Sequence, residues 1–179
     1  MTENIKLHDK VFKPFIGEAK LQEAIQKVAD KLNKDLKDEN PLFLIVLNGA
    51  FVFAADLLRK FNYDCDISFI KLSSYSGTKS THTVREIIGL DYNVKDRTIV
   101  LIEDIVDTGI TMEHVINQMD KLGAKEVKIA TLLFKPGSFQ KSYDIDYIAL
   151  DIPNDFIVGY GLDYDGKGRN IPEIYTIVE

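Results

Sequence analysis

Apolar residues recur at helical spacing in two stretches of the chain. In residues 18–37 they are Leu21, Ala24, Ile25, Val28, Ala29, Leu32 and Leu36. Residues three and four apart share one face of a helix, so this stretch predicts an amphipathic helix. Residues 112–122 predict a second helix, and Gly123 is typical of its C-terminal end. The apolar face of that helix consists of Met112, Val115, Ile116, Met119 and Leu122.

Other segments are apolar without alternation. Residues 42–47 form a continuous apolar run after Pro41. A short run of this kind is typical of a strand that is buried on both faces of a parallel sheet. Asn48-Gly49-Ala50 then turns the chain into a helix that we expect to end near Lys60. Further strands are predicted at 66–72, 84–88, 98–103 and 127–134.

Strands that alternate with helices predict an α/β fold, with a mostly parallel twisted sheet flanked by helices. The 179 residues fit a single domain, residues 1–179. Within it, the polar stretch 73–83 predicts a long exposed loop, and such loops are usually functional lids or disordered. We expect the N-terminal segment and the C-terminal segment, from Asp144 onward, to form a small hood over the sheet edge.

Composition narrows the choice of partners. The chain has 22 Lys+Arg and 28 Asp+Glu, with a formal net charge of -6 and no basic run, which argues against nucleic acid. The single Cys65 excludes an intrachain disulfide and is ordinary in a reduced compartment. No apolar run approaches the ~20 residues of a membrane span, and the N-terminus lacks a signal-peptide core. We therefore expect a cytoplasmic protein without a membrane partner.

The candidate chemistry lies in residues 103–111, Glu-Asp-Ile-Val-Asp-Thr-Gly-Ile-Thr, at the end of a predicted strand. Ligands bind at the carboxyl ends of strands in open α/β sheets. A glycine-containing loop that enters a helix exposes N–H groups that can bind a phosphate, and the hydroxyls of Thr108 and Thr111 add donors. The adjacent acids Glu103 and Asp104 suit a ribose diol and Mg²⁺.

Acids at a strand end followed by a Thr-Gly turn also occur as solvated turns. The full nine-residue string favours the functional interpretation, because it resembles the phosphoribosyl pyrophosphate (PRPP) loop of phosphoribosyltransferases at nearly every position. Other segments, from about residue 10 to the C-terminus, extend the resemblance to the hypoxanthine-guanine phosphoribosyltransferase family. They are Leu47-Asn48-Gly49-Ala50, Ser74-Tyr75, Lys135, Phe156-Ile157-Val158-Gly159-Tyr160 and Asp163 to Arg169.

The resemblance implies a type I phosphoribosyltransferase fold and a Mg²⁺-dependent reaction of purine salvage. PRPP and hypoxanthine or guanine would give IMP or GMP and pyrophosphate. Glu103 and Asp104 would bind the ribose hydroxyls and Mg²⁺, and Asp107 would act as general base near N7 of the purine. The 5′-phosphate would be bound by Asp107, Thr108, Gly109, Ile110 and Thr111.

The resemblance also implies a base pocket, a pyrophosphate subsite and a lid. Lys135 would donate to O6 of the purine, since an ammonium group has donors only and opposes the 6-amino group of adenine. In the pocket, Phe156 would stack on the base, Ile157 would contact it through its backbone, and Asp163 would hold a second Mg²⁺. Pyrophosphate would be bound by Arg169 and by Asn48 and Gly49, the latter through a non-proline cis peptide. Ser74 and Tyr75 would belong to the lid.

Several of these residues, and the function itself, have an alternative interpretation. Lys135 also fits a solvated lysine at a strand end, and Phe156 also fits core packing. Many relatives have Lys in place of Asn48, and some have Lys in place of Ile110, so PRPP affinity and subunit contacts can differ. Xanthine is not excluded as the base. A non-catalytic nucleotide-binding regulator would need a basic face, and a receiver-like domain would leave Arg169 unexplained. The family precedent predicts a homodimer or homotetramer.

Overall fold

The computed structural model describes residues 3–74, 84–88 and 92–178. Its larger sheet has six strands in the order β5-β4-β3-β6-β7-β8. Every neighbouring pair is parallel except β4 and β5, which are antiparallel. The strands are β3 (Leu42–Leu47), β4 (Asp66–Ser74), β5 (Val84–Ile88), β6 (Thr98–Val106), β7 (Glu126–Phe134) and β8 (Tyr147–Asp151). The predicted mostly parallel α/β sheet is confirmed.

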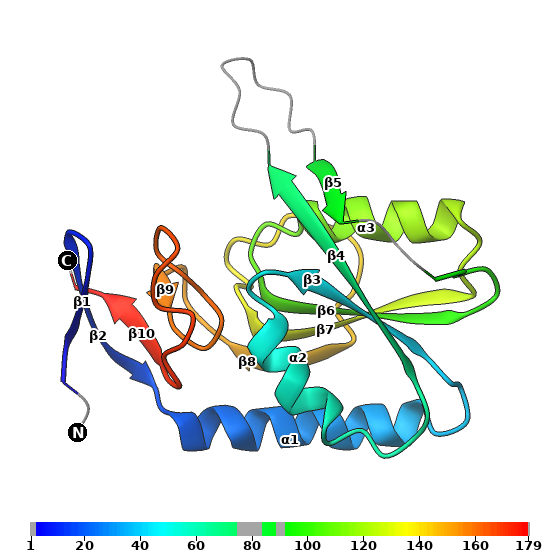
Figure 1. The fold of residues 1–179 in the computed structure, drawn as a ribbon, viewed down its shortest axis with the longest axis horizontal. Coiled ribbons are helices and arrows are strands. Elements are labelled where there is room, and N and C mark those ends of the chain that lie inside the picture. The colour runs from blue at the N-terminus through cyan, green and yellow to red at the C-terminus, as the bar shows by residue number, and fades with distance from the viewer. Residues whose placement is uncertain (1–2, 75–83, 89–91, 179) are drawn as a thin grey trace.

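Helices cover both faces of this sheet (Figure 1). Helices α1 (Glu18–Asp35) and α2 (Phe51–Leu58) lie on one face, and α3 (Ile110–Lys121) lies on the other. The predicted apolar face of the first helix is buried: Leu21, Ala24, Ile25, Val28, Ala29, Leu32 and Leu36 are each at most 4% exposed. No helix in the described ranges combines the length and apolar character needed to cross a membrane.

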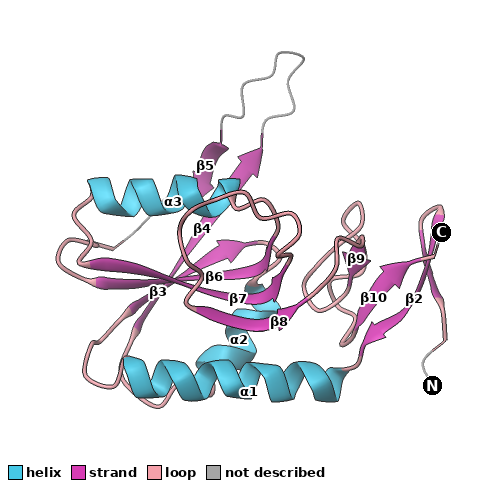
Figure 2. Ribbon diagram, turned by 180° about the vertical axis from the view of Figure 1, so that it is seen from behind, coloured by secondary structure: helices cyan, strands magenta, loops and turns pink. Residues whose placement is uncertain are grey.

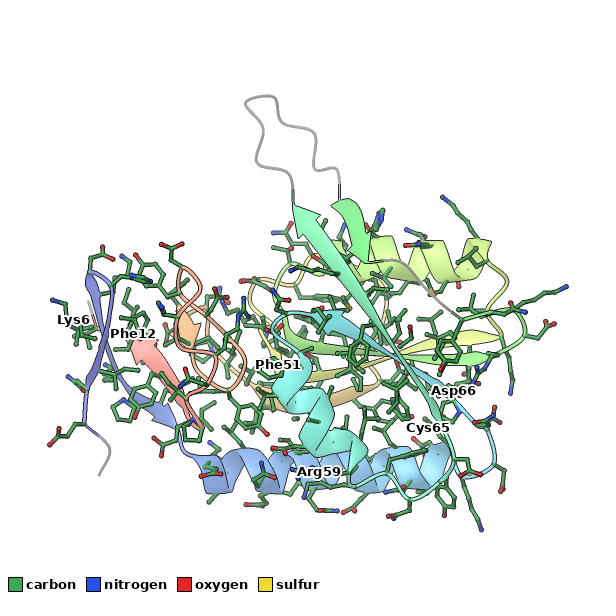
Figure 3. The ribbon with its side chains drawn as sticks, in the orientation of Figure 1. Lys6, Phe12, Phe51, Arg59, Cys65 and Asp66 are labelled. Carbon is green, nitrogen blue, oxygen red and sulfur yellow. The ribbon has the colours of Figure 1, made fainter. Side chains whose placement is uncertain are left out.

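A smaller antiparallel sheet lies beside the larger one, and Figure 2 shows both from behind. Its order is β1-β2-β10-β9. The strands are β1 (Ile5–Leu7), β2 (Lys10–Ile16), β9 (Ile157–Val158) and β10 (Ile174–Ile177). Phe12, labelled in Figure 3, is fully buried there with Val158 and Tyr175. We call this unit the hood sheet.

The prediction that the chain belongs to the hood from Asp144 onward is wrong for β8. This strand pairs in parallel with β7, in the register Ala130↔Tyr147, and forms one edge of the larger sheet. Most of its residues are only partly buried, as on many edge strands, and its apolar run, Tyr147 to Leu150, is shorter than that of the central strand β3.

Two predicted features have different bounds or lie outside the described residues. Strand β6 continues past the predicted end at residue 103 to Val106, so Asp104 also belongs to the strand rather than to the loop after it. The predicted lid, residues 73–83, falls mostly outside the described ranges: Tyr75 is among the residues not described, and Ser74 ends β4 opposite Val84.

Candidate active site

Two adjacent carboxylates, Glu103 and Asp104, lie near the carboxyl end of β6, and both residues are buried. Oδ1 of Asp104 accepts a hydrogen bond from the backbone N of Ile105 at 2.9 Å. Oε1 of Glu103 accepts one from the backbone N of Asp104 at 3.3 Å. Oε2 of Glu103 is buried without a partner among the described residues. Buried polar atoms are usually hydrogen-bonded, so this oxygen is an acceptor with free capacity.

The charge of this pair is poorly compensated by the protein. Burial raises the pKa of Glu103 well above its ordinary value, and the neighbouring charge of Asp104 adds to the effect. Within the described ranges, no three His, Cys, Asp or Glu side chains converge on one point. The two adjacent carboxylates, one with an oxygen unpartnered among the described residues, fit Mg²⁺, which retains water and phosphate oxygens and takes only one or two carboxylates from a protein.

A cavity lies at the acidic pair and the loop that follows it. It has a volume of about 270 Å³ and is lined by every residue from Glu103 to Met112, together with Val46 and Leu72. Gly109 has a φ of +84° and precedes the first turn of α3. The first N–H groups of a helix have no intrahelical partner, so the start of α3 offers donors to an anion in this cavity. We call residues 107–111 the phosphate loop.

A segment that sequence reasoning missed packs against the phosphate loop. The hydroxyl of Tyr143 donates to the carbonyl oxygen of Gly109 at 2.6 Å, and the backbone N of Gln140 donates to that of Thr108 at 3.3 Å. A Cβ at Gly109 would stand 2.6 Å from the ring of Phe139. In the sequence, the only sign of this segment was its two aromatic residues, four positions apart. The fold is needed to show that they pack against the phosphate loop.

Asp107 and Lys135 are brought together from two neighbouring strands. Asp107 directly follows β6 and Lys135 directly follows β7, and the backbone N of Lys135 donates to the oxygen of Val106 at 3.0 Å. Nζ of Lys135 lies 3.2 Å from Oδ2 of Asp107. The lysine side chain is 11% exposed and that of Asp107 is 47% exposed. Lys135 is therefore a buried, paired cation rather than a solvated one.

The turn after β3 lies against the acidic pair. The peptide bond between Leu47 and Asn48 is cis, as the family resemblance implied. A Cβ at Gly49 would overlap the Oδ2 atom of Asp104. Only glycine leaves room for the carboxylate at this distance, so the turn and the acids form one continuous surface.

Residues 159–169, which we call the hood loop, carry the last predicted site residues. Nη2 of Arg169 lies 2.7 Å from Oδ1 of Asp163, and its Nη1 donates to the oxygen of Gly161 at 2.7 Å. A Cβ at Gly161 would overlap the backbone oxygen of Gly49. Asp163 and Arg169 are therefore held together on a loop that packs on the turn beside the acidic pair.

Phe156 packs against other rings of the hood. Its side chain is 45% exposed, and its described ring contacts are with Phe12 and Tyr164 of the hood, at centroid distances of 6.2 and 5.7 Å. The following residue, Ile157, is buried in β9. None of the described ring contacts joins Phe156 to Lys135. Its partial exposure leaves part of the side chain accessible to a further contact.

Acids at a strand end, a glycine-containing loop at the start of a helix and a glycine turn are features on which the resemblance to phosphoribosyltransferases rests. A model of the phosphoribosyl transferase domain matches residues 18–165. The hypoxanthine-guanine phosphoribosyltransferase of Streptococcus thermophilus is 39% identical over 155 residues, 86% of either chain. A crystal structure of such an enzyme from Bacillus anthracis has a TM-score of 0.87 and 36% identity, over 93% of this chain and 98% of that one. The chain belongs to the hypoxanthine-guanine phosphoribosyltransferase family.

A longer relative shares the same region. The bifunctional protein TilS/HprT of Listeria innocua is 38% identical over 172 residues, which is 96% of this chain. The chain spans about a quarter, 26%, of the length of that relative.

Proposed function

We propose that the protein transfers the 5-phosphoribosyl group of PRPP to hypoxanthine and guanine, releasing pyrophosphate and forming IMP or GMP. The observation that carries this proposal is the pair formed by Asp107 and Lys135 beside the phosphate loop. It places a carboxylate and an ammonium group at the ends of adjacent strands, next to a cavity for a phosphate.

The reaction needs a proton acceptor near the base and a stabilised cation on the sugar. A bond forms between N9 of the purine and C1′ of the ribose, and the bond from C1′ to pyrophosphate breaks. Asp107 accepts the proton from N7, and its negative charge steadies the positive charge that develops on the ribose, as carboxylates do in glycoside hydrolysis. The exposed fraction of Asp107, 47%, leaves this carboxylate accessible to a ligand.

The remaining roles follow the position of each group. Glu103 and Asp104 would hold Mg²⁺, which when bound neutralises phosphate charge. The phosphate loop binds the 5′-phosphate through backbone N–H groups and the hydroxyls of Thr108 and Thr111, since Ile110 contributes no charge. Asn48, Gly49 and Arg169 bind the pyrophosphate group, and a guanidinium fork suits phosphate oxygens. Asp163 would approach a second Mg²⁺.

Base selection rests on Lys135. Its ammonium group can donate to O6 of hypoxanthine, guanine or xanthine, but it opposes the 6-amino group of adenine. Phe156 stacks on the base with its free face, and the backbone of Ile157 contacts it. Xanthine is the alternative base, because selection at position 2 depends on the backbone near Ile157 and Asp163.

A homodimer is supported by an uncovered apolar face. Ile67 and Phe69 on β4 pair with Phe43 and Ile45 and therefore point to the face that α1 and α2 cover, yet they are 40% and 45% exposed. Phe51 at the start of α2 is 46% exposed on the same side of the sheet (Figure 3). This face begins at the turn that binds pyrophosphate, so a second copy here would border the site.

The free, partly buried Cys65 is consistent with the reducing cytoplasm.

One assay tests the proposal. The protein is incubated with PRPP and Mg²⁺ and, in parallel, hypoxanthine, guanine, xanthine or adenine, and nucleotide formation is followed. We expect IMP and GMP to form at least tenfold faster than AMP, since a mispaired buried polar group costs roughly one to three kcal/mol. Preference for adenine would refute the base assignment, and preference for xanthine would favour the alternative.

A further inference from the structure

A polar cluster outside the cavity joins the hood loop to both helices of one face. Tyr160, a buried residue of the hood loop, donates its hydroxyl to Oδ2 of Asp56 on α2. Nε2 of Gln22 on α1 donates to the same oxygen at 2.7 Å. Arg59 binds the other oxygen, Oδ1. One carboxylate therefore receives donors from the hood loop, from α1 and from its own helix.

The backbone of the hood loop directs Tyr160 toward this carboxylate. Tyr160 has a φ of +49°, between Gly159 at +100° and Gly161 at +101°. A left-handed conformation is uncommon for a bulky residue and persists where surrounding contacts fix it. The backbone N of Tyr160 donates to the oxygen of Ile171 at 2.8 Å, and that of Gly161 to the oxygen of Arg169 at 3.0 Å.

The same loop position leads directly to the proposed pyrophosphate subsite. Gly161, next to Tyr160, accepts a hydrogen bond from Arg169 and lies against the backbone oxygen of Gly49. Asp56 lies on α2, which starts at the end of the turn that contains Gly49. The hood loop thus meets the turn and its helix at two points, Tyr160 with Asp56 and Gly161 with Gly49.

The charges in the cluster suit a fixed contact. Burial disfavours the ionised form of Asp56, but hydrogen bonds from Tyr160, Gln22 and Arg59 outweigh it and lower the pKa of this carboxyl below its ordinary value. Burial, together with the hydrogen bond to Asp56, raises the pKa of Tyr160, so the phenol keeps its proton. Hydrogen bonds to a charged acceptor are stronger than those between neutral groups.

We propose that Asp56 and Tyr160 are positioning residues for the pyrophosphate subsite, because their contact fixes Arg169 on the hood loop relative to the turn at Gly49. The proposal rests on the proposed function, which supplies the ligand of that subsite. Neither side chain touches the ligand. Their loss should weaken binding of PRPP and pyrophosphate and leave binding of the purine base largely intact.

The test compares Tyr160→Phe with Asp56→Asn, which keeps the shape of the side chain but removes its charge. For each variant, KM is measured for PRPP and hypoxanthine in the forward reaction and for pyrophosphate in the reverse reaction. We expect KM for PRPP and pyrophosphate to rise about tenfold, the range of one charge-assisted hydrogen bond, and KM for hypoxanthine to change less than about twofold. In the double variant, KM for PRPP and pyrophosphate should be no higher than in the more strongly affected single variant, because both substitutions break the same contact.

Tyr147→Phe is the matched control. Tyr147 is also buried and its hydroxyl also donates to a helix carboxylate, Oδ2 of Asp35 at 3.2 Å, but it lies on β8. The Tyr147→Phe substitution should lower the melting temperature without changing KM for pyrophosphate. Circular dichroism checks the folding of each variant, and Asp56→Asn gives an independent reading if Tyr160→Phe does not fold.

The possible outcomes separate the two proposals. Unchanged KM for pyrophosphate in both variants, or equal increases for PRPP and hypoxanthine, would overturn the positioning role while leaving the transferase in place. A loss of folding in both Tyr160→Phe and Asp56→Asn would also overturn the positioning role. A native protein without transferase activity would refute the proposed function instead. In that case, titration calorimetry with Mg²⁺ and pyrophosphate on the native protein and the variants decides the positioning role. A native protein that binds no pyrophosphate would overturn the positioning role as well.

Discussion

Lys135 and Asp107 form an ion pair, Nζ to Oδ2 at 3.2 Å, that joins the ends of two adjacent parallel strands. A 6-oxopurine has O6 and N7 on one edge, as the recognition of guanine in DNA illustrates. Lys135, which is proposed to recognise O6, therefore lies beside Asp107, which is proposed to accept the proton of N7. Parallel pairing of β6 and β7 sets their separation, so base selection and chemistry share one structural origin.

Asp107→Asn tests the chemical half of this pair. The amide keeps the size of the side chain but cannot accept the proton of N7, so turnover should fall about 10²- to 10⁴-fold, the usual contribution of a general base. Steady-state kinetics with hypoxanthine measures this. PRPP binding by calorimetry should change little, because the N–H groups of the phosphate loop remain. Wild-type turnover in the variant would refute the role.

Lys135→Ala tests the recognition half. The variant loses the donor to O6, so kcat/KM for hypoxanthine should fall more than tenfold, and the ratio of hypoxanthine to adenine use should fall with it. Lys128→Ala is the control, since Lys128 lies on β7, the strand that Lys135 follows, and pairs with Glu126 at 3.0 Å. Equal effects of the two substitutions would show that Lys135 acts on stability and not on the base.

The sequence predicted the parts of the site better than their contacts. The continuous apolar run of β3 and the periodic apolar stripe of α1 are short-range sequence patterns, and both elements are present. The contact of Gly49 with Asp104, and that of Gly161 with Gly49, join segments far apart in the chain. Such pairs depend on strand order, which no local pattern contains. The edge strand β8 was assigned to the hood because its short apolar run does not show which sheet it joins.

Gly49→Ala probes the contact between the turn and the acids. The added methyl group would overlap the carboxylate of Asp104, so either the turn or the acid must move. We expect kcat/KM for PRPP to fall at least tenfold, because a small misplacement in a site costs much of the rate. Gly17→Ala is the control, since a Cβ there meets nothing closer than 4.0 Å. Normal kinetics in Gly49→Ala would show that the turn can relax.

Tyr143→Phe tests how the phosphate loop is held and has a defined pH dependence. The hydroxyl of Tyr143 donates to Gly109, and burial, with the charge of Glu113, raises the pKa of Tyr143 from 10.0 to about 12. A raised folded-state pKa stabilises the native protein fully below pH about 10 and loses that effect as the pH rises through about 12. The variant should therefore be less stable by about 1 kcal/mol at neutral pH.

Urea unfolding at several pH values checks this. The difference between native protein and Tyr143→Phe should be constant up to pH about 10 and shrink above it. Tyr92→Phe, at an exposed tyrosine, should show little difference at neutral pH. A gap between native protein and Tyr143→Phe that widens with pH would contradict the assignment of the raised pKa to this phenol.

Phe69→Glu tests whether a second copy covers the apolar face of β4 and α2. Phe69 is 45% exposed beside Ile67, and burying such rings between two chains is favourable by roughly 25 cal/mol per Å². A buried glutamate without a partner would oppose that association. We expect the native protein to elute as a dimer or a larger even assembly in size-exclusion chromatography with light scattering, and the variant to elute as a smaller species with an unchanged circular dichroism spectrum.

Phe15→Glu separates this effect from a general effect of added charge. Phe15 is 38% exposed on β2 of the hood sheet, on a surface that we do not assign to the interface. It should leave the assembly unchanged. Because the α2 end of the apolar face adjoins the turn at Gly49, dissociation by Phe69→Glu should also raise KM for PRPP. A native monomer would refute the dimer, and dissociation by both substitutions alike would show that the effect is not specific to this face.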